Sequence, residues 1–147
     1  MPYEKVRDLT RQLLQAVETI HKIKICHRDL KPDNILISKD PLQNESLHLT
    51  LIDFGIGFDF RHGEPMIGKS GVKIWSAPET RSWTEYDEKC DLWSVGCLTT
   101  YMLTGKFPEK QFSTQDIIEE IRLKFYDIQD SYQLTNLLNK LLKHNST

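Results

Sequence analysis

The sequence predicts a mainly helical fold with one short β-hairpin. Residues 4–23 carry apolar side chains at helical spacing with charged residues between them, which is typical of an amphipathic helix. Residues 91–104 are apolar on most faces, so a buried central helix is expected there. Two short apolar runs, at 35–37 and 47–52, flank a polar stretch, which is the pattern of a hairpin. A chain of 147 residues suggests one domain with a core of its own.

The elements after the hairpin are a long loop and two helices. Residues 55–76 are rich in glycine and show no period, so a long loop is expected, of the kind that is usually functional or mobile. Ser113-Thr114-Gln115-Asp116 resembles a capping box and precedes an isoleucine-rich run, which predicts a helix start. The leucines between 134 and 142 predict a last amphipathic helix.

Composition and charge exclude several classes of partner. A net charge of −2 gives no reason to expect nucleic acid or an anionic membrane. The longest apolar stretch, 92–103, is interrupted by Ser94, Thr99 and Thr100 and is too short and too polar to span a bilayer. Residues 1–5 hold no apolar run of the kind that a secretory signal needs. The expected location is therefore the cytoplasm or the nucleus.

The cysteines and most of the histidines suggest neither disulfides nor a metal site. Cys26, Cys90 and Cys97 are an odd count at scattered spacings, which predicts a reducing compartment and no zinc pattern. Four histidines share no metal-ligand spacing and are expected at the surface: His21, His48, His62 and His144.

Two segments carry charged groups suited to phosphoryl transfer. The first is His27-Arg28-Asp29-Leu30-Lys31-Pro32-Asp33-Asn34, and the second is Asp53-Phe54-Gly55 at the end of a short apolar strand. Moving a phosphoryl group to a hydroxyl needs in-line positioning, cancellation of phosphate charge and a group that orients the hydroxyl. Asp29 is the candidate base, because a carboxylate accepts the hydroxyl proton or a hydrogen bond from it. Lys31 is placed to reach the transferring phosphate.

Magnesium is the cofactor that the remaining groups suggest. Asn34 offers an amide oxygen and Asp53 a carboxylate, and both are the hard oxygen ligands that Mg²⁺ prefers. Each short motif alone is usually a solvated turn. A catalytic role is favoured because these motifs occur together with two further ones, in this order and in the expected structural contexts. The two are Ala77-Pro78-Glu79 and Asp91-Leu92-Trp93-Ser94-Val95-Gly96.

These ordered motifs resemble the protein kinase family, of the serine/threonine type. The resemblance covers residues 1–147, from the helix before the catalytic loop to a late helix of the large, C-terminal lobe. It implies the fold of that lobe, the use of ATP and Mg²⁺, and transfer of the γ-phosphate to Ser/Thr hydroxyls of a protein substrate. Residues 86–94 look like the calcium/calmodulin-dependent and calcium-dependent kinases.

The resemblance implies catalytic or cofactor-binding roles for five residues. Asp29 matches the base, and Lys31 matches the lysine that serine/threonine kinases carry at this position and that contacts the phosphate. Asn34 and Asp53 match the magnesium ligands. Leu36 matches the apolar residue that packs under the adenine ring.

Further residues match regulatory or structural positions of the family. Arg28 matches the arginine that receives an activation-loop phosphate, and Glu79 matches the carboxylate that pairs with a late arginine. Asp91 matches the residue that hydrogen-bonds the catalytic-loop backbone. His27 and Phe54 match packing positions in the hydrophobic spine.

Three departures from the family pattern limit what is carried over. No Gly-x-Gly-x-x-Gly occurs and one helix uses residues 1–26, so the small lobe with its glycine-rich loop and strand lysine is expected to be missing. Val72 stands where serine/threonine kinases usually have a threonine, and valine cannot hydrogen-bond the base and the lysine. The arginine that would pair with Glu79 is not in the sequence, and an unpaired buried carboxylate is costly.

Regulation and activity each leave alternatives open. Ser70 is the candidate phosphosite for capture by Arg28, because Ser76 lies too close to the closing motif. An acidic residue, Asp59 or Glu64, is the alternative partner of Arg28. For the whole chain, one reading is a kinase segment completed by a missing N-terminal lobe. A second is an inactive kinase-like lobe that binds substrates or another kinase as a module or decoy. A third is a non-functional gene remnant that folds poorly because its lobe interface is exposed as an apolar patch. None of these readings predicts tight binding of ATP by the chain alone.

Overall fold

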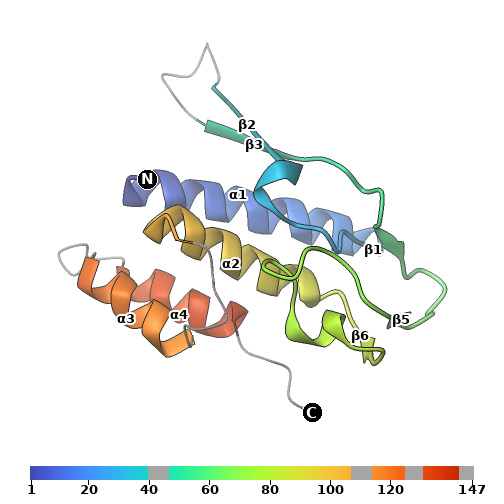
Figure 1. The fold of residues 1–147 in the computed structure, drawn as a ribbon. Coiled ribbons are helices and arrows are strands. Elements are labelled where there is room, and N and C mark those ends of the chain that lie inside the picture. The colour runs from blue at the N-terminus through green and yellow to red at the C-terminus, as the bar shows by residue number, and fades with distance from the viewer. Residues whose placement is uncertain (40–46, 107–113, 125–130, 143–147) are drawn as a thin grey trace.

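The computed structural model describes residues 1–39, 47–106, 114–124 and 131–142. Within these ranges the chain forms four α-helices: α1 Tyr3–Lys22, α2 Cys90–Thr104, α3 Thr114–Lys124 and α4 Ser131–Leu141. Figure 1 shows α1 and α2 side by side, with a hairpin against α1 and the pair α3 and α4 on the other side of α2. The predicted mainly helical fold with one hairpin is confirmed. None of the described helices is long and apolar enough to cross a membrane.

Helix α1 forms where the apolar spacing predicts it, within one residue at each end. Its buried side chains recur every three or four residues, from Val6 through Leu9 and Leu13 to Val17. Glu4 in the first turn and Lys22 in the last turn oppose the partial charges of the helix ends. The buried face packs against α2, where the hydroxyls of Thr10 and Thr99 hydrogen-bond at 3.2 Å. This helix pair is the base on which the catalytic loop rests.

The predicted hairpin consists of β2 Ile35–Lys39 and β3 Leu47–Leu51. The strands are antiparallel, with Ile35 opposite Leu51 and Lys39 opposite Leu47. Gln12 of α1 fixes β3, because its amide nitrogen donates to the Leu47 carbonyl at 2.8 Å and its amide oxygen accepts from Leu49 N at 2.9 Å. These hydrogen bonds fix the position of β3, which leads to Asp53, relative to α1.

The predicted loop at 55–76 contains two short strands that the sequence did not suggest. β4 Phe58–Asp59 pairs antiparallel with β1 Ile25–Cys26, and β5 Met66–Ile67 pairs with β6 Glu85–Tyr86. A strand of two residues is too short to show the alternation of apolar and polar side chains that identifies a strand. The pairing of β4 with β1 brings the loop back to the residues just before His27, and the pairing of β5 with β6 joins it to the segment before α2.

Helix α2 is central and buried on nearly all faces. It ends at Thr104 and is capped by Gly105, which has a left-handed φ of 74° and donates its backbone N–H to the Tyr101 carbonyl. Gly96 allows the end of α4 to approach closely, since a Cβ there would lie 2.8 Å from Leu142 Cδ2 and 3.1 Å from Leu141 Cβ. The predicted capping box cannot be compared in full, because Ser113 lies outside the described residues.

Candidate active site

Asp91, at the start of α2, anchors the catalytic loop. Its side chain is fully buried, and its two carboxylate oxygens accept the backbone N–H groups of His27 and Arg28, both at 2.9 Å. Arg28 has a φ of 65°, a left-handed conformation that a non-glycine residue adopts only at a cost. The two hydrogen bonds offset that cost and fix the direction in which the loop continues. The expected contact between Asp91 and the loop backbone is present.

Asp29, Lys31 and Asn34 converge in space. Lys31 Nζ lies 2.7 Å from Asp29 Oδ2, and Asn34 Nδ2 donates to the same oxygen at 3.1 Å and to the Asp29 carbonyl at 2.8 Å. The short 3₁₀ turn Pro32–Asn34 makes this possible by folding the chain back over Asp29. The hydrogen bond with Asp29 raises the pKa of Lys31, so its ammonium stays charged. One carboxylate is therefore held by a cation and an amide.

Asp53 follows β3 and is tied to the catalytic loop through the backbone. Ile52 N donates to the Asn34 carbonyl at 3.0 Å, and His27 Nε2 donates to the Ile52 carbonyl at 3.1 Å. Asp53 has a φ of 62°, and its Oδ1 accepts Gly55 N at 3.1 Å in a tight turn. The rings of His27 and Phe54 are in contact, with centroids 4.7 Å apart. The two motifs that are separate in sequence thus form one unit.

The two candidate magnesium ligands have atoms suited to the ion. The amide nitrogen of Asn34 donates hydrogen bonds to Asp29. The amide oxygen of Asn34 therefore lies on the side of the amide group that is turned away from Asp29. Asp53 is exposed and presents a carboxylate from the adjoining turn. An amide oxygen and a carboxylate form a hard donor set, so these residues fit Mg²⁺. Leu36, the candidate adenine contact, lies on β2 with 53% of its surface exposed.

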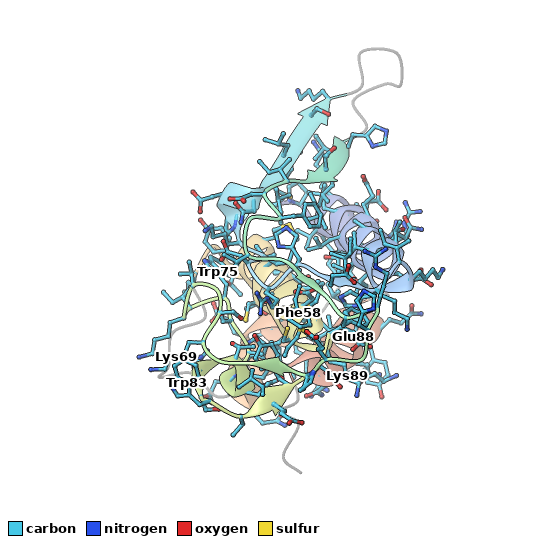
Figure 2. All side chains as sticks on the ribbon, turned by 90° about the vertical axis from the view of Figure 1, so that its right-hand side faces the viewer. Phe58, Lys69, Trp75, Trp83, Glu88 and Lys89 are labelled. Atoms are coloured by element: carbon cyan, nitrogen blue, oxygen red, sulfur yellow. The ribbon has the colours of Figure 1, made fainter. Side chains whose placement is uncertain are left out.

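Arg28 is linked to Ser70 through the hydroxyl of Tyr86. The guanidinium donates to the Ile56 carbonyl at 2.7 Å and to Tyr86 Oη at 3.4 Å, and Ser70 Oγ lies 3.0 Å from that same hydroxyl. Arg28 also lies over the ring of Phe58, 5.2 Å from its centroid. Figure 2 shows Phe58 near the middle of this face, between Lys69 and Trp83 on one side and Glu88 and Lys89 on the other.

Asp59, one of the two acidic alternatives to Ser70, has a different partner. Arg61 donates to both of its carboxylate oxygens and to Oδ1 through its backbone N–H. These hydrogen bonds lower the pKa of Asp59 to about 2. Glu64, the other alternative, is exposed.

The residues at the end of the loop show two of the expected departures. Val72 is 45% exposed, and it is its backbone carbonyl, not its side chain, that takes part in hydrogen bonds, from Trp75 N and from Ser76 N and Oγ. Glu79 Oε2 is buried and has no hydrogen-bond partner among the described residues. The Arg81 guanidinium lies nearby in sequence but donates to the Ser76 carbonyl at 2.6 Å.

The expectation that His21 is a surface residue is wrong. Its imidazole is 16% exposed, and its Nε2 lies 2.8 Å from Asp91 Oδ2. Cys26 Sγ lies 3.3 Å from the same oxygen and 3.6 Å from Cys90 Sγ. The contact with Cys90 and burial raise the pKa of the Cys26 thiol. No spacing rule finds this cluster, because its two halves lie more than sixty positions apart and meet only in the fold.

Comparison with known proteins agrees with this geometry. A model of the protein kinase domain matches residues 1–147. The chain belongs to the protein kinase family. It is 36% identical to sperm motility kinase 3A of Mus musculus over 144 residues, which are 96% of this chain and 27% of that protein.

Two further relatives of this kinase-family chain confirm the resemblance to serine/threonine kinases that include the calcium-dependent group. Calcium-dependent protein kinase 4 of Plasmodium falciparum is 31% identical over 137 residues, covering 92% of this chain and 25% of the relative. A probable myosin light chain kinase of Dictyostelium discoideum is 34% identical over 136 residues, covering 92% and 42%. The chain thus spans between a quarter and two fifths of the length of these relatives.

Proposed function

We propose that this chain supplies the catalytic-loop wall of a serine/threonine protein kinase, which transfers the γ-phosphate of ATP to a protein hydroxyl in the cytoplasm or the nucleus. The observation that carries the proposal is the convergence of Asp29, Lys31 and Asn34, with Lys31 Nζ 2.7 Å and Asn34 Nδ2 3.1 Å from one oxygen of Asp29. Holding a base, a cation and a metal-ligand candidate in one fixed cluster is what phosphoryl transfer requires.

Asp29 and Lys31 have complementary roles in this proposal. Asp29 accepts a hydrogen bond from the substrate hydroxyl, orients its lone pair toward the phosphorus and takes up the proton as the new bond forms. Lys31 stays protonated, because its hydrogen bond with Asp29 raises its pKa. Its ammonium opposes the negative charge of the transferring phosphoryl group. Since both side chains are mostly buried, their geometry is set before substrate arrives.

Asn34 and Asp53 are the residues that would hold Mg²⁺, and Leu36 would contact the adenine. Magnesium held there would offset the negative charge of the nucleotide phosphates. Asn34 keeps its amide oxygen for this purpose, because its nitrogen is committed to Asp29. Asp53 is kept in position by the links of Ile52 to Asn34 and His27. Residues covering the other side of the nucleotide would come from a small, N-terminal lobe.

The proposal is tested by phosphate transfer from ATP to a serine peptide, measured with the full-length protein that contains this chain. Asp29→Asn is expected to lower kcat by about 10²–10⁴-fold, since a positioned base contributes that much. Asp33→Asn is the matched control, because Asp33 is an exposed acid of the same loop that makes no contact used above. Equal rates for wild type and Asp29→Asn would remove the proposal.

A protein-binding module is the second candidate, and one observation favours it. Four large apolar side chains on β2 and in the turn after β3, close in sequence to the candidate adenine and magnesium contacts, are between 42% and 53% exposed: Leu36, Ile37, Phe54 and Ile56. An exposed apolar group of this kind marks an interaction site, and its partner would be another kinase or a small lobe. A full-length protein that binds such a partner and transfers no phosphate would support this candidate over the first.

Phosphorylation of Ser70 is the regulation that we propose for the kinase. Ser70 Oγ and the Arg28 guanidinium both contact Tyr86 Oη, so a phosphate on Ser70 would replace the hydroxyl link by a charged one. The left-handed backbone of Arg28 precedes Asp29 directly, so ordering Arg28 orders the base. Ser70→Ala is expected to lower the rate of the phosphorylated protein, and unchanged behaviour in transfer and binding assays would exclude this role.

A further inference from the structure

Four side chains with metal-binding atoms meet beneath the catalytic loop, and the proposed phosphoryl transfer leaves most of them without a role. His21 comes from the end of α1, Cys26 from β1, and Cys90 and Asp91 from the first turn of α2. His21 Nε2, Cys26 Sγ and one carboxylate oxygen of Asp91 all lie within 4.8 Å of one another. Cys90 Sγ is 3.6 Å from Cys26 Sγ. The imidazole, the Cys26 thiol and the carboxylate thus face a common point, and the thiol of Cys90 adjoins this group through Cys26.

We propose that His21, Cys26, Cys90 and Asp91 form a zinc site that fastens the end of α1 and the entry of the catalytic loop to the start of α2. Bonds of about 2.0 Å to nitrogen and oxygen and about 2.3 Å to sulfur place neighbouring ligands of a tetrahedral zinc ion roughly 3.3–3.8 Å apart. The distance from Cys26 Sγ to Asp91 Oδ2 is 3.3 Å, and that between the two sulfurs is 3.6 Å. The 2.8 Å contact of His21 with Asp91 has to open, and the side chain of Cys90 has to turn toward the other three ligands.

The donor set selects the metal. Thiolate and imidazole ligands suit zinc, whereas Mg²⁺ and Ca²⁺ take sites made of oxygen atoms alone. Binding is an exchange of protons for the ion: the thiols of Cys26 and Cys90 each lose a proton to solvent. The proton that His21 Nε2 shares with Asp91 leaves Nε2, for solvent or for Nδ1 of the same ring, and the ion then takes the place of that hydrogen bond. No oxidant or reductant is needed. The site is therefore chemically separate from the candidate magnesium site at Asn34 and Asp53, and it stands whether or not the chain transfers phosphate.

The surroundings orient the ligands and give access. The backbone N–H groups of His27 and Arg28 hold the Asp91 carboxylate, which is the outer support that metal-binding carboxylates need. His21 forms part of the wall of a surface groove of about 770 Å³ that lies between α1, the start of α2 and α4. Cys26, Cys90 and Asp91 are almost completely buried, so the ion enters from this groove past the imidazole.

The competing use of the two thiols is a disulfide between Cys26 and Cys90. That reaction needs an oxidant and would join only two of the four groups, leaving the convergence of His21 and Asp91 on the same point unexplained. A count of reactive thiols distinguishes the two uses. Zinc protects the thiolates reversibly, whereas a disulfide leaves no free thiol at either cysteine. Cys97 is a third buried cysteine on α2 outside the cluster, so it provides an internal control.

The experiment measures zinc bound to the chain after purification with reductant, and then repeats the titration with Co²⁺. One zinc ion per chain is expected, with a thiolate-to-cobalt charge-transfer band and the strong visible bands of tetrahedral Co²⁺. Zinc is also expected to raise the melting temperature, since it binds only the folded arrangement. Removing the ion with a chelator should reverse both effects.

Three variants decide the assignment. Cys26→Val and His21→Gln are expected to weaken zinc binding by more than about tenfold and to abolish the gain in melting temperature. Cys90→Ala is expected to weaken it likewise and to reduce the charge-transfer band by about half, one thiolate of two being lost. Cys97→Ala should match wild type. Circular dichroism without metal checks that each variant folds.

Three outcomes would overturn the zinc site. The first is a wild-type chain that takes up neither zinc nor cobalt at micromolar concentration. The second is Cys26→Val binding zinc as wild type does, or Cys97→Ala losing it equally. The third is a Cys26–Cys90 disulfide in protein purified without reductant, because the same sulfurs cannot then ligate the ion.

Discussion

At the residue scale, the geometry of the candidate catalytic loop depends on a few side chains whose partners come from distant parts of the sequence. Asp91 is the clearest case, because it holds two consecutive backbone N–H groups of the loop and contacts His21 and Cys26. A left-handed Arg28 stays in place only while these hydrogen bonds persist.

Asp91→Asn should therefore destabilise the fold more than a surface substitution does. The asparagine side chain has only one acceptor oxygen and carries no charge. The substitution therefore removes hydrogen bonds from the backbone to a charged group, and each such bond is worth about 1.5–3 kcal/mol. We expect the free energy of unfolding, measured by urea denaturation with chelator present, to fall by roughly 2–4 kcal/mol. Asp8→Asn, on the exposed face of α1, is the control and should change little. A fall in the free energy of unfolding of less than about 1 kcal/mol would contradict the anchoring role of Asp91.

The pairing of Asp59 with Arg61 gives a direct test by titration. The hydrogen bonds from Arg61 hold the pKa of Asp59 at about 2, below the ordinary value of 3.8. In Arg61→Ala we expect the pKa of Asp59, followed by NMR of the side-chain carboxyl, to rise toward that ordinary value. If Arg28 is the partner instead, the Arg61 substitution will leave the pKa low and Arg28→Ala will raise it.

At the residue scale, the sequence predicted the local chemistry of the motif residues but did not predict the cluster of side chains beside them. Asp29, Lys31 and Asn34 lie within six positions, so their local chemistry could be predicted, and the fold brings them together. His21 was expected at the surface because no spacing links it to Cys90 or Asp91. Only the packing of α1 against α2 creates that neighbourhood, and periodicity does not encode which helix faces pair.

At the element scale, long periodic elements were predictable and very short ones were not. The two long helices, α1 and α2, and the β2–β3 hairpin have enough residues for the apolar period to be visible. The strands β4 and β5 have two residues each and form because β1 and β6 lie next to them. The loop that was expected to lack structure is thus fixed at two points, which holds Ser70 near Arg28.

Gly96 tests how closely α2 and the end of α4 approach. Alanine gains roughly 1 kcal/mol in helix propensity, but its Cβ would lie 2.8 Å from Leu142 Cδ2 and 3.1 Å from Leu141 Cβ. Overpacking of this kind costs about 1–3 kcal/mol. We expect Gly96→Ala to lower the free energy of unfolding, as measured by denaturant titration.

The matched experiment is a double-mutant cycle with Leu142→Ala. Removing the Leu142 side chain frees the space that the new methyl group needs, so the double variant should be less destabilised than the sum of the single variants. Strict additivity would show that the close contact of Gly96 with Leu142 does not limit packing.

At the scale of the whole molecule, the candidate nucleotide contact Leu36 is half exposed, as are Phe54 and Ile56 beside Asp53 in the sequence. The 147 residues hold no glycine-rich phosphate loop. Calorimetry of the 147-residue chain with ATP and Mg²⁺ should therefore give no tight binding. Micromolar affinity would contradict this expectation and would mean that this wall alone suffices to hold the nucleotide.

The central claim is that Asp29 and Asp53, from two separate segments, act as one catalytic unit. The most direct measurement is kcat for phosphate transfer to a serine peptide by the full-length protein carrying Asp29→Asn, Asp53→Ala or both. Residues that act as a unit are strongly non-additive, so the double variant should be about as slow as the slower single variant. A double variant whose loss equals the product of the two single losses, or single variants with wild-type rates, would contradict the account.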